Sequence, residues 1–186
     1  NIMVSEYIPG KTFDEILDRD MDYSRLLLLF KIHGFFMFTI GTFHGDIHPG
    51  NLMWYGEKIY FIDTGAIGHV SARLSSGLLN FFEALSVYDY DRCALKLNEM
   101  AEIGISGHAF EKFCNKFKIL YSDFRERNVS EVSLTKKMME TIKLGVNSGM
   151  SFEKGMFSII KSLMFLDGMV LRCNPKARLM EDMRKF

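Results

Sequence analysis

Apolar residues recur at helical spacing through most of the chain beyond Gly68. A repeat near 3.6 residues predicts amphipathic helices, because side chains three or four positions apart share one helix face. The predicted helices cover residues 72–87, 89–103, 108–126, 133–144 and 151–172. The breaks between them contain Gly, Asn or Ser, and Asp89 and Ser106 stand where N-caps are expected. We therefore predict a mainly α fold.

The segment 23–42 is apolar on nearly every face. A helix of this kind is buried on all sides or crosses a membrane. Lys31 and His33 interrupt the segment, and its uninterrupted apolar runs are far shorter than the roughly 20 residues that a span needs. We expect no transmembrane segment here and interpret residues 23–42 as the central helix of a helical lobe.

The chain before this helix has strand and capping signals. Residues 2–8 have the composition of an apolar strand, which ends at Pro9 and Gly10. Thr12, followed three residues later by Glu15, is typical of a capping box. A short helix is therefore expected to begin after Thr12 and to end at about Leu17.

A polar loop and a hairpin follow the central helix. The loop, residues 43–51, reads Phe-His-Gly-Asp-Ile-His-Pro-Gly-Asn. Its proline lacks an N–H and its glycines tolerate unusual dihedral angles, so a shaped loop is expected. Residues 52–55 and 59–62 are apolar and flank Gly-Glu-Lys, which predicts a short hairpin before Asp63-Thr64-Gly65.

Length and composition narrow the class of protein. The 186 residues (21.5 kDa, 48% hydrophobic) suit one globular domain with a real core. The formal net charge of zero argues against a nucleic-acid partner. Cys93, Cys114 and Cys173 are isolated, which favours a reducing compartment. With no visible signal peptide, we expect an intracellular protein of the cytoplasm or an organellar matrix.

Three oxygen-bearing side chains have the spacing of a phosphotransferase site: Asp46, Asn51 five positions later, and Asp63 after the second hairpin strand. A kinase catalytic loop places an Asp beside the acceptor hydroxyl and an Asn five positions later on Mg²⁺. A second Asp, after a strand, holds the metal that bridges the phosphates. Mg²⁺ prefers such hard oxygen ligands. The spacing predicts Asp46 as the catalytic residue and Asn51 and Asp63 as the metal ligands.

A different metal chemistry is also compatible with this loop. His44, Asp46 and His48 alternate along the chain, and His with carboxylate is a common ligand set for zinc. That interpretation leaves Asn51 and Asp63 without a role.

The loop and its surroundings resemble the UbiB, or ADCK, family of atypical kinases. The family's loop is close to His-Ala-Asp-Pro-His-Pro-Gly-Asn, followed by a strand and Asp-Phe-Gly. This chain differs at Gly45, Ile47 and Thr64 and keeps the acid and amide positions. The late predicted helix, which stops before Asn174 and Pro175, is also similar to the family pattern.

The resemblance implies the large C-terminal lobe of a protein-kinase-like fold across residues 1–186. Within it, 1–10 would be the hinge strand, 43–65 the catalytic loop, hairpin and metal motif, and 71–186 the helical part. The resemblance implies an ATP- and Mg²⁺-dependent kinase or ATPase that supports ubiquinone biosynthesis. The implied partners are a lipid precursor or lipid-biosynthesis enzymes at the periphery of a membrane.

The resemblance also implies roles for single residues. The backbone of Glu6, Tyr7 and Ile8 would bind the adenine edge of the nucleotide. His48 would contact phosphate or fill the loop, whereas His44 would brace the loop by hydrogen bonding.

Two other functions stay open. One is a small-molecule phosphotransferase of the aminoglycoside or choline kinase type, although His48-Pro49-Gly50 favours the UbiB pattern. The other is a pseudokinase scaffold, because the sequence contains no Gly- or Ala-rich phosphate loop and no strand Lys paired with a helix Glu. We expect the small N-terminal lobe to be absent from residues 1–186.

Overall fold

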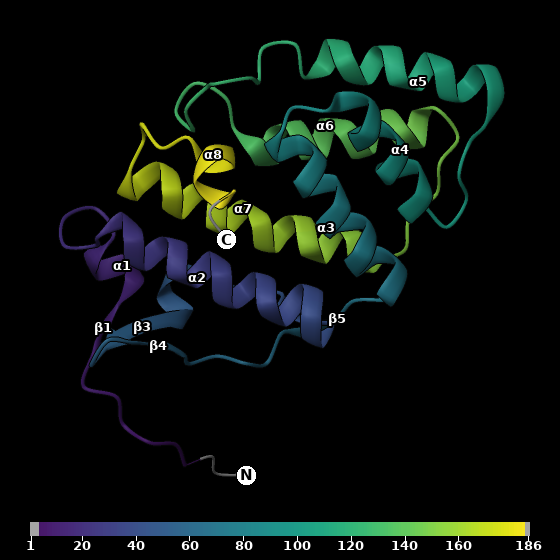
Figure 1. The fold of residues 1–186 in the computed structure, drawn as a ribbon. Helices are drawn as coiled ribbons and strands as arrows, with labels where there is room; N and C mark the ends of the chain where they lie inside the picture. The colour runs from purple at the N-terminus through teal and green to yellow at the C-terminus, as the bar shows by residue number, and fades with distance from the viewer. Residues whose placement is uncertain (1–3, 185–186) are drawn as a thin grey trace.

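The computed structural model describes residues 4–184 and is mainly helical, with two small antiparallel sheets on one side (Figure 1). The α-helices are α1 (Phe13–Ile16), α2 (Tyr23–Phe35), α3 (Ala72–Ser86), α4 (Tyr90–Met100), α5 (Gly107–Leu120), α6 (Leu134–Asn147), α7 (Gly155–Cys173) and α8 (Leu179–Met183). The strands are β1 (Lys11–Thr12), β2 (Thr42–His44), β3 (Leu52–Tyr55), β4 (Lys58–Phe61) and β5 (Ile67–His69). A π-helix η1 (Phe36–Ile40) and a 3-10 helix η2 (Pro49–Asn51) complete the elements. The predicted mainly α, kinase-like fold with a small hairpin is confirmed.

The predicted strand at the start of the chain is wrong over its described part, residues 4–8. This stretch forms no strand, and Tyr7 is 84% exposed. Its other residues, 2 and 3, lie outside the described residues. A strand needs a neighbour for its backbone groups, and only Lys11 and Thr12 find one, opposite Trp54 and Met53 of β3.

The capping box and the short first helix are confirmed. The Thr12 backbone N–H donates to the Glu15 carboxylate at 2.7 Å, and the Thr12 hydroxyl donates to the same oxygen at 2.9 Å. Helix α1 begins directly after Thr12 and ends at Ile16, with Leu17 at its C-cap. Phe13 and Leu17 are buried, so α1 contributes to the core.

The predicted central helix is confirmed as α2 continued by η1. Asp22 caps it by accepting from Ser24 N–H, and Gly41 ends it with a left-handed φ of 79°. Its core face includes Leu26, Leu29 and Met37, but burial on all sides was wrong: Phe35 and Ile40 are each 54% exposed. By length and composition alone, Tyr23–Ile40 could cross a membrane, a test that a core helix of a soluble protein also passes. It packs beside α7 (Figure 1).

The predicted helices of the second half all form, with shifted ends. Helix α5 stops at Leu120 although the prediction ran to residue 126. Residues 121–126 form turns, and Phe124 within them continues the buried stripe of Phe113 and Phe117. Helix α4 likewise stops at Met100, and α6 continues to Asn147. Asp89 caps α4 through Arg92 N–H, whereas Ser106 occupies the N-cap position of α5 without a side-chain hydrogen bond. The short α8 was not predicted.

The predicted hairpin is confirmed as β3 and β4. Leu52 pairs with Phe61 and Tyr55 with Lys58, so the connecting turn is Gly56-Glu57. Both turn residues have positive φ, 54° and 63°, as the tight two-residue turns of hairpins require.

The sequence did not predict a second pair of strands, one before the loop and one after the hairpin. Strand β2 pairs with β5, with Phe43 opposite Gly68. A Cβ at position 68 would lie only 2.4 Å from the Phe43 ring, so a glycine is needed for this close pairing. The pair draws together the two ends of segment 43–67.

Candidate active site

Backbone hydrogen bonds close segment 43–67 into a compact unit. Beyond the β2–β5 pair, Gly45 N–H donates to the Ala66 carbonyl at 2.7 Å. Ile62 N–H donates to the Asn51 carbonyl at 3.0 Å, at the base of the hairpin. A Cβ at Gly45 would lie 2.9 Å from the Ala66 carbonyl oxygen, so this approach also depends on glycine. The polar loop 43–51 and the segment around Asp63 are thus held against each other.

His44 links Asp46 and Asp63 within this unit. Its Nδ1 accepts from Asp46 N–H at 3.2 Å, which leaves the proton on Nε2 to be donated to the Asp63 carbonyl. The ring is 5% exposed and stacks on Phe61. The expected bracing role of His44 agrees with these contacts, because a change in its orientation would move both Asp46 and Asp63.

Asn51 lies beside Asp46, as the five-residue spacing suggested. Its amide nitrogen donates to the Asp46 carbonyl at 3.0 Å and approaches the Asp46 carboxylate Oδ2 at 3.4 Å. The other carboxylate oxygen, Oδ1, accepts from Lys161 Nζ at 2.9 Å. This hydrogen bond with Lys161 holds the pKa of Asp46 below its ordinary value, so the carboxylate is ionised at neutral pH.

Asp63 is exposed and opens a turn. Its Oδ1 accepts from Gly65 N–H at 3.0 Å, which fixes the carboxylate at the end of the hairpin. The Asn51 amide nitrogen is committed to Asp46. The groups left to bind a metal are then all oxygens: the Asn51 amide oxygen and the charged carboxylates of Asp46 and Asp63. This donor set fits Mg²⁺, which binds proteins through few carboxylates and shares its other positions with water and phosphate.

The zinc interpretation receives no geometric support. Among residues 4–184, no three His, Cys, Asp or Glu side chains are grouped so that they could hold a metal ion. Both ring nitrogens of His44 contact backbone groups, and His48 Nδ1 accepts from Gly50 N–H at 3.1 Å. Three of the four ring nitrogens of His44 and His48 therefore contact backbone groups within segment 43–67.

The two remaining groups of predicted binding residues are placed differently. His48 is the N-cap of η2 and packs its ring edge-on against Phe165, with centroids 5.4 Å apart. Glu6 and Tyr7 are exposed in an extended segment that leaves the body of the molecule in Figure 1. The structure thus keeps His48 in the loop and does not bring Glu6, Tyr7 or Ile8 to Asp46; their adenine-binding role stays a prediction.

Lys161 is the site residue that the sequence did not reveal. It lies on α7, 115 residues after Asp46. A lysine on the polar side of an amphipathic helix has no local feature that distinguishes it from a solvated surface residue. Only the packing of α7 beside α2 and β5 brings it to the loop.

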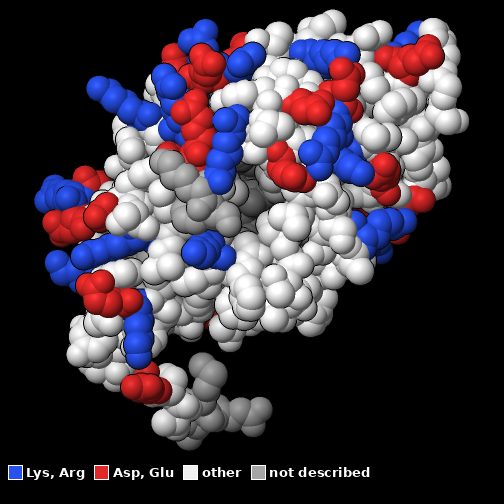
Figure 2. Space-filling view, viewed as in Figure 1, with Lys and Arg blue, Asp and Glu red and all other residues white. Residues whose placement is uncertain are grey.

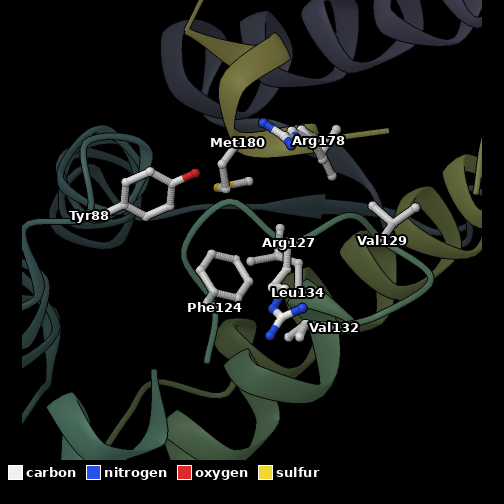
Figure 3. Close-up of a pocket in the computed structure, with 9 residues that line it drawn as sticks. Tyr88, Phe124, Arg127, Val129, Val132, Leu134, Arg178 and Met180 are labelled. Atoms are coloured by element: carbon white, nitrogen blue, oxygen red, sulfur yellow. The ribbon is translucent and has the colours of Figure 1, made fainter. Parts of the chain in front are cut away.

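Two recesses differ in their relation to the site. Figure 3 shows a small one of about 20 Å³, between Tyr88, the α5–α6 connection and α8. None of its lining residues belongs to the loop, and its volume suits about one water molecule. A second recess of about 210 Å³ borders the site: His44, Phe61 and Thr64 line it, with Phe36 and Ile67.

These features agree with the family to which the chain belongs, the ABC1 atypical kinase-like domain, whose sequence model matches residues 1–97. The chain is 23% identical to the probable protein kinase UbiB of Histophilus somni, covering 100% of this chain and 36% of that protein. It is 24% identical to an uncharacterized protein in the hydrogenase 1 5′ region of Clostridium pasteurianum, covering 97% of this chain and 34% of the relative.

A plant relative extends the comparison. An uncharacterized chloroplastic aarF domain-containing protein kinase of Arabidopsis thaliana is 21% identical over 77% of this chain and 31% of the relative. The chain thus spans about a third of the length of the curated relatives that it matches. The resemblance to the UbiB family is confirmed.

Proposed function

We propose that this chain carries the catalytic loop and metal motif of an ATP- and Mg²⁺-dependent kinase or ATPase. The observation that supports the proposal most is the linkage of Asp46 and Asp63 through one buried imidazole, His44, with Asn51 against Asp46. The loop that carries Asp46 and Asn51 is thereby linked to the segment that carries Asp63, which supports a common site for the three side chains. Membership of the kinase-like family supports the same reaction class.

Each residue has a part in the proposed reaction. Asp46 orients the acceptor hydroxyl or water and takes its proton, for which an ionised carboxylate is required. Asn51 and Asp63 hold Mg²⁺, which neutralises charge on the phosphates when it is bound. His48 contacts phosphate or fills the loop, and the backbone of Glu6 to Ile8 binds the adenine. Positioning and charge neutralisation supply most of the catalysis.

The proposed biological setting is the synthesis of ubiquinone, with a lipid precursor or lipid-biosynthesis enzymes as partners. It rests on the family resemblance and on one surface. Figure 2 shows few charged side chains over the region where α2 ends and β5 lies. The exposed side chains there include Phe35, Phe36, Ile40 and Ile67. An apolar face of this kind supports a partner at a membrane surface.

Calorimetric titration of the full-length protein with Mg²⁺-ATP tests the metal site. Asp63→Asn should weaken Mg²⁺-dependent binding of ATP by at least ~10-fold, because it removes a charged ligand from the metal. Asp20→Asn, at an exposed aspartate outside the loop, is the matched control and should bind as the wild type does. Equal affinity of wild type and Asp63→Asn would contradict the proposal.

A further inference from the structure

Lys161 reaches the catalytic loop from the opposite half of the sequence. Its Nζ lies 2.9 Å from Asp46 Oδ1, and its side chain is 57% exposed, so the ammonium faces the open side of the site. Asp46 Oδ2 is approached by Asn51. The two oxygens of the catalytic carboxylate therefore have different neighbours, a cation on one and an amide on the other.

Lys161 has a second contact besides its ion pair with Asp46. Its ammonium also lies over the ring of Phe165, 5.6 Å from the centroid, and that ring packs against His48 of the loop. Phe165 is one turn further along α7. The buried residues Ile159 and Ile160 anchor the helix beside them. A lysine stem is otherwise flexible, and these contacts restrict its ammonium to the neighbourhood of Asp46.

Phosphoryl transfer needs positive charge at this point. Negative charge is spread over the equatorial oxygens of the transferred group, and fixed cations stabilise it. Residues 43–51 contain neither Lys nor Arg. An acceptor oxygen bonded to Asp46 would lie about 2.6–3.2 Å from the carboxylate. Lys161 Nζ lies at a similar distance from the same carboxylate, 2.9 Å. The ammonium is therefore near the acceptor oxygen, and an oxygen of the phosphoryl group that the acceptor attacks would lie within its reach.

We propose that Lys161 is a catalytic cation that contacts the transferred phosphoryl group. This inference rests on the proposed kinase or ATPase function. In the free protein the Lys161 ammonium donates to Asp46 Oδ1. When the acceptor hydroxyl or water donates to that oxygen instead, the ammonium turns to a γ-phosphoryl oxygen. The bond between the γ-phosphorus and the bridging oxygen breaks, and its electron pair stays on ADP. A bond from the acceptor oxygen to phosphorus forms, and the acceptor proton passes to Asp46. Lys161 neither gives up nor accepts a proton in this step.

Binding of a phosphoryl mimic separates this role from a structural one. The full-length protein is titrated with Mg²⁺-ADP alone and with Mg²⁺-ADP plus aluminium fluoride, which imitates the phosphoryl group in flight. Lys161→Met should bind Mg²⁺-ADP within about threefold of wild type but lose ~10–100-fold of affinity for the fluoride complex, as expected when one charge-stabilising donor is removed. Lys161→Arg, which keeps the charge, should recover part of that loss.

Lys116→Met is the matched control, because Lys116 is exposed on α5 and outside the site. An unchanged ratio of the two affinities in Lys161→Met would overturn the inference while leaving the proposed function in place. An equal loss for both ligands would also overturn it, because it would indicate a role in folding or nucleotide binding only. If wild type binds neither ligand, the proposed function fails as well.

Discussion

At Thr64 the chain carries a small side chain beside a mostly apolar recess of about 210 Å³. The UbiB-type motif has phenylalanine at this position. The recess has room for an aromatic ring next to Phe36 and Phe61, and Thr64 itself is exposed. The smaller residue therefore leaves the metal motif less firmly packed than an aromatic residue would.

Thr64→Phe should accordingly be tolerated or slightly stabilising, within ~1 kcal/mol of wild type, because the added ring enters existing space. Urea denaturation gives the free energy of unfolding. Thr64→Ala is the control, since it removes the hydroxyl without filling the recess. A loss of more than about 2 kcal/mol in Thr64→Phe, the scale of overpacking, would show that other side chains already occupy the recess.

His33 is a buried titratable residue at the edge of the same recess. Its Nε2 shares a hydrogen bond of 2.8 Å with Ser162 Oγ, and only 4% of the residue is exposed. Burial, helped by nearby His44, lowers the pKa of His33 to about 4. The neutral imidazole is thus part of the folded core between α2 and α7.

The stability of the protein should fall as pH drops from 6.5 towards 4. In that window the unfolded chain binds a proton at His33 and the folded chain does not, so protonation favours unfolding. The stabilisation from neutral His33 is fully present above the pKa of this residue in the unfolded chain. It is lost as the pH falls towards the folded-state pKa, and the loss amounts to about 3 kcal/mol. The free energies of unfolding are measured at pH 7 and 4.5. His33→Gln should lack the part of the decrease that comes from protonation of His33. Identical pH dependence in both proteins would contradict the assignment.

Among the elements, α3 and α4 approach each other closely at Gly77. A Cβ at this position would lie 2.4 Å from the Met100 Cβ, closer than packed atoms can come. Gly168, on α7, is also inside a helix but has nothing within 4 Å of its Cβ direction. The two glycines therefore differ in packing while sharing the low helix propensity of glycine.

Gly77→Ala should destabilise the protein by about 1–3 kcal/mol, because overpacking outweighs the propensity gained. Gly168→Ala should instead stabilise it by up to ~1 kcal/mol, the propensity difference between the residues. Thermal or urea denaturation of both variants tests the pair. Stabilisation by both alanines would mean that α3 and α4 can move apart without cost.

The elements also show what the sequence could and could not predict. The helices and the β3–β4 hairpin follow from local periodicity and turn residues, as do the capping residues Thr12 and Asp89. The β2–β5 pair does not, because three-residue strands carry little pattern and their pairing depends on Gly68 accepting the Phe43 ring. The strand predicted over residues 2–8 did not form where it is described, because no neighbouring strand pairs with it.

The same division holds for the site. Asp46, Asn51 and Asp63 lie within one short stretch, so their spacing was readable without a structure, and the bracing by His44 was expected. Lys161 was not, because its role depends on the packing of α7 against the loop. Local spacing thus predicts the ligands, whereas the distant cation requires the fold.

At the scale of the whole molecule, early and late segments are tied together. Arg172, near the end of α7, donates to the carboxylates of Asp14 and Asp18 at 2.6–2.9 Å. Tyr23 at the start of α2 donates to Asp182 in α8 at 3.0 Å. The first two helices, α1 and α2, are thus tied to the last two, α7 and α8.

Metal content distinguishes the two chemistries considered for this lobe. Elemental analysis of the full-length protein should find no stoichiometric zinc, and Mg²⁺-ATP should raise its melting temperature, an increase that Asp63→Asn abolishes. Activity should fall less in His48→Gln than in Asp46→Asn, because in the proposed reaction Asp46 takes the acceptor proton whereas His48 is secondary. Stoichiometric zinc, with no thermal response to Mg²⁺-ATP, would overturn the magnesium assignment.

The contact between Asp46 and Lys161 has a consequence for how the protein is made. The two residues are 115 positions apart, so at a translation rate of ~5–20 residues per second the lysine is synthesised roughly 6 to 23 s after the aspartate. Throughout that interval the nascent chain carries an acidic loop whose cation has not yet been added. A ribosome-bound product that stops before α7 would thus contain Asp46, Asn51 and Asp63 but lack the ammonium group that contacts Asp46.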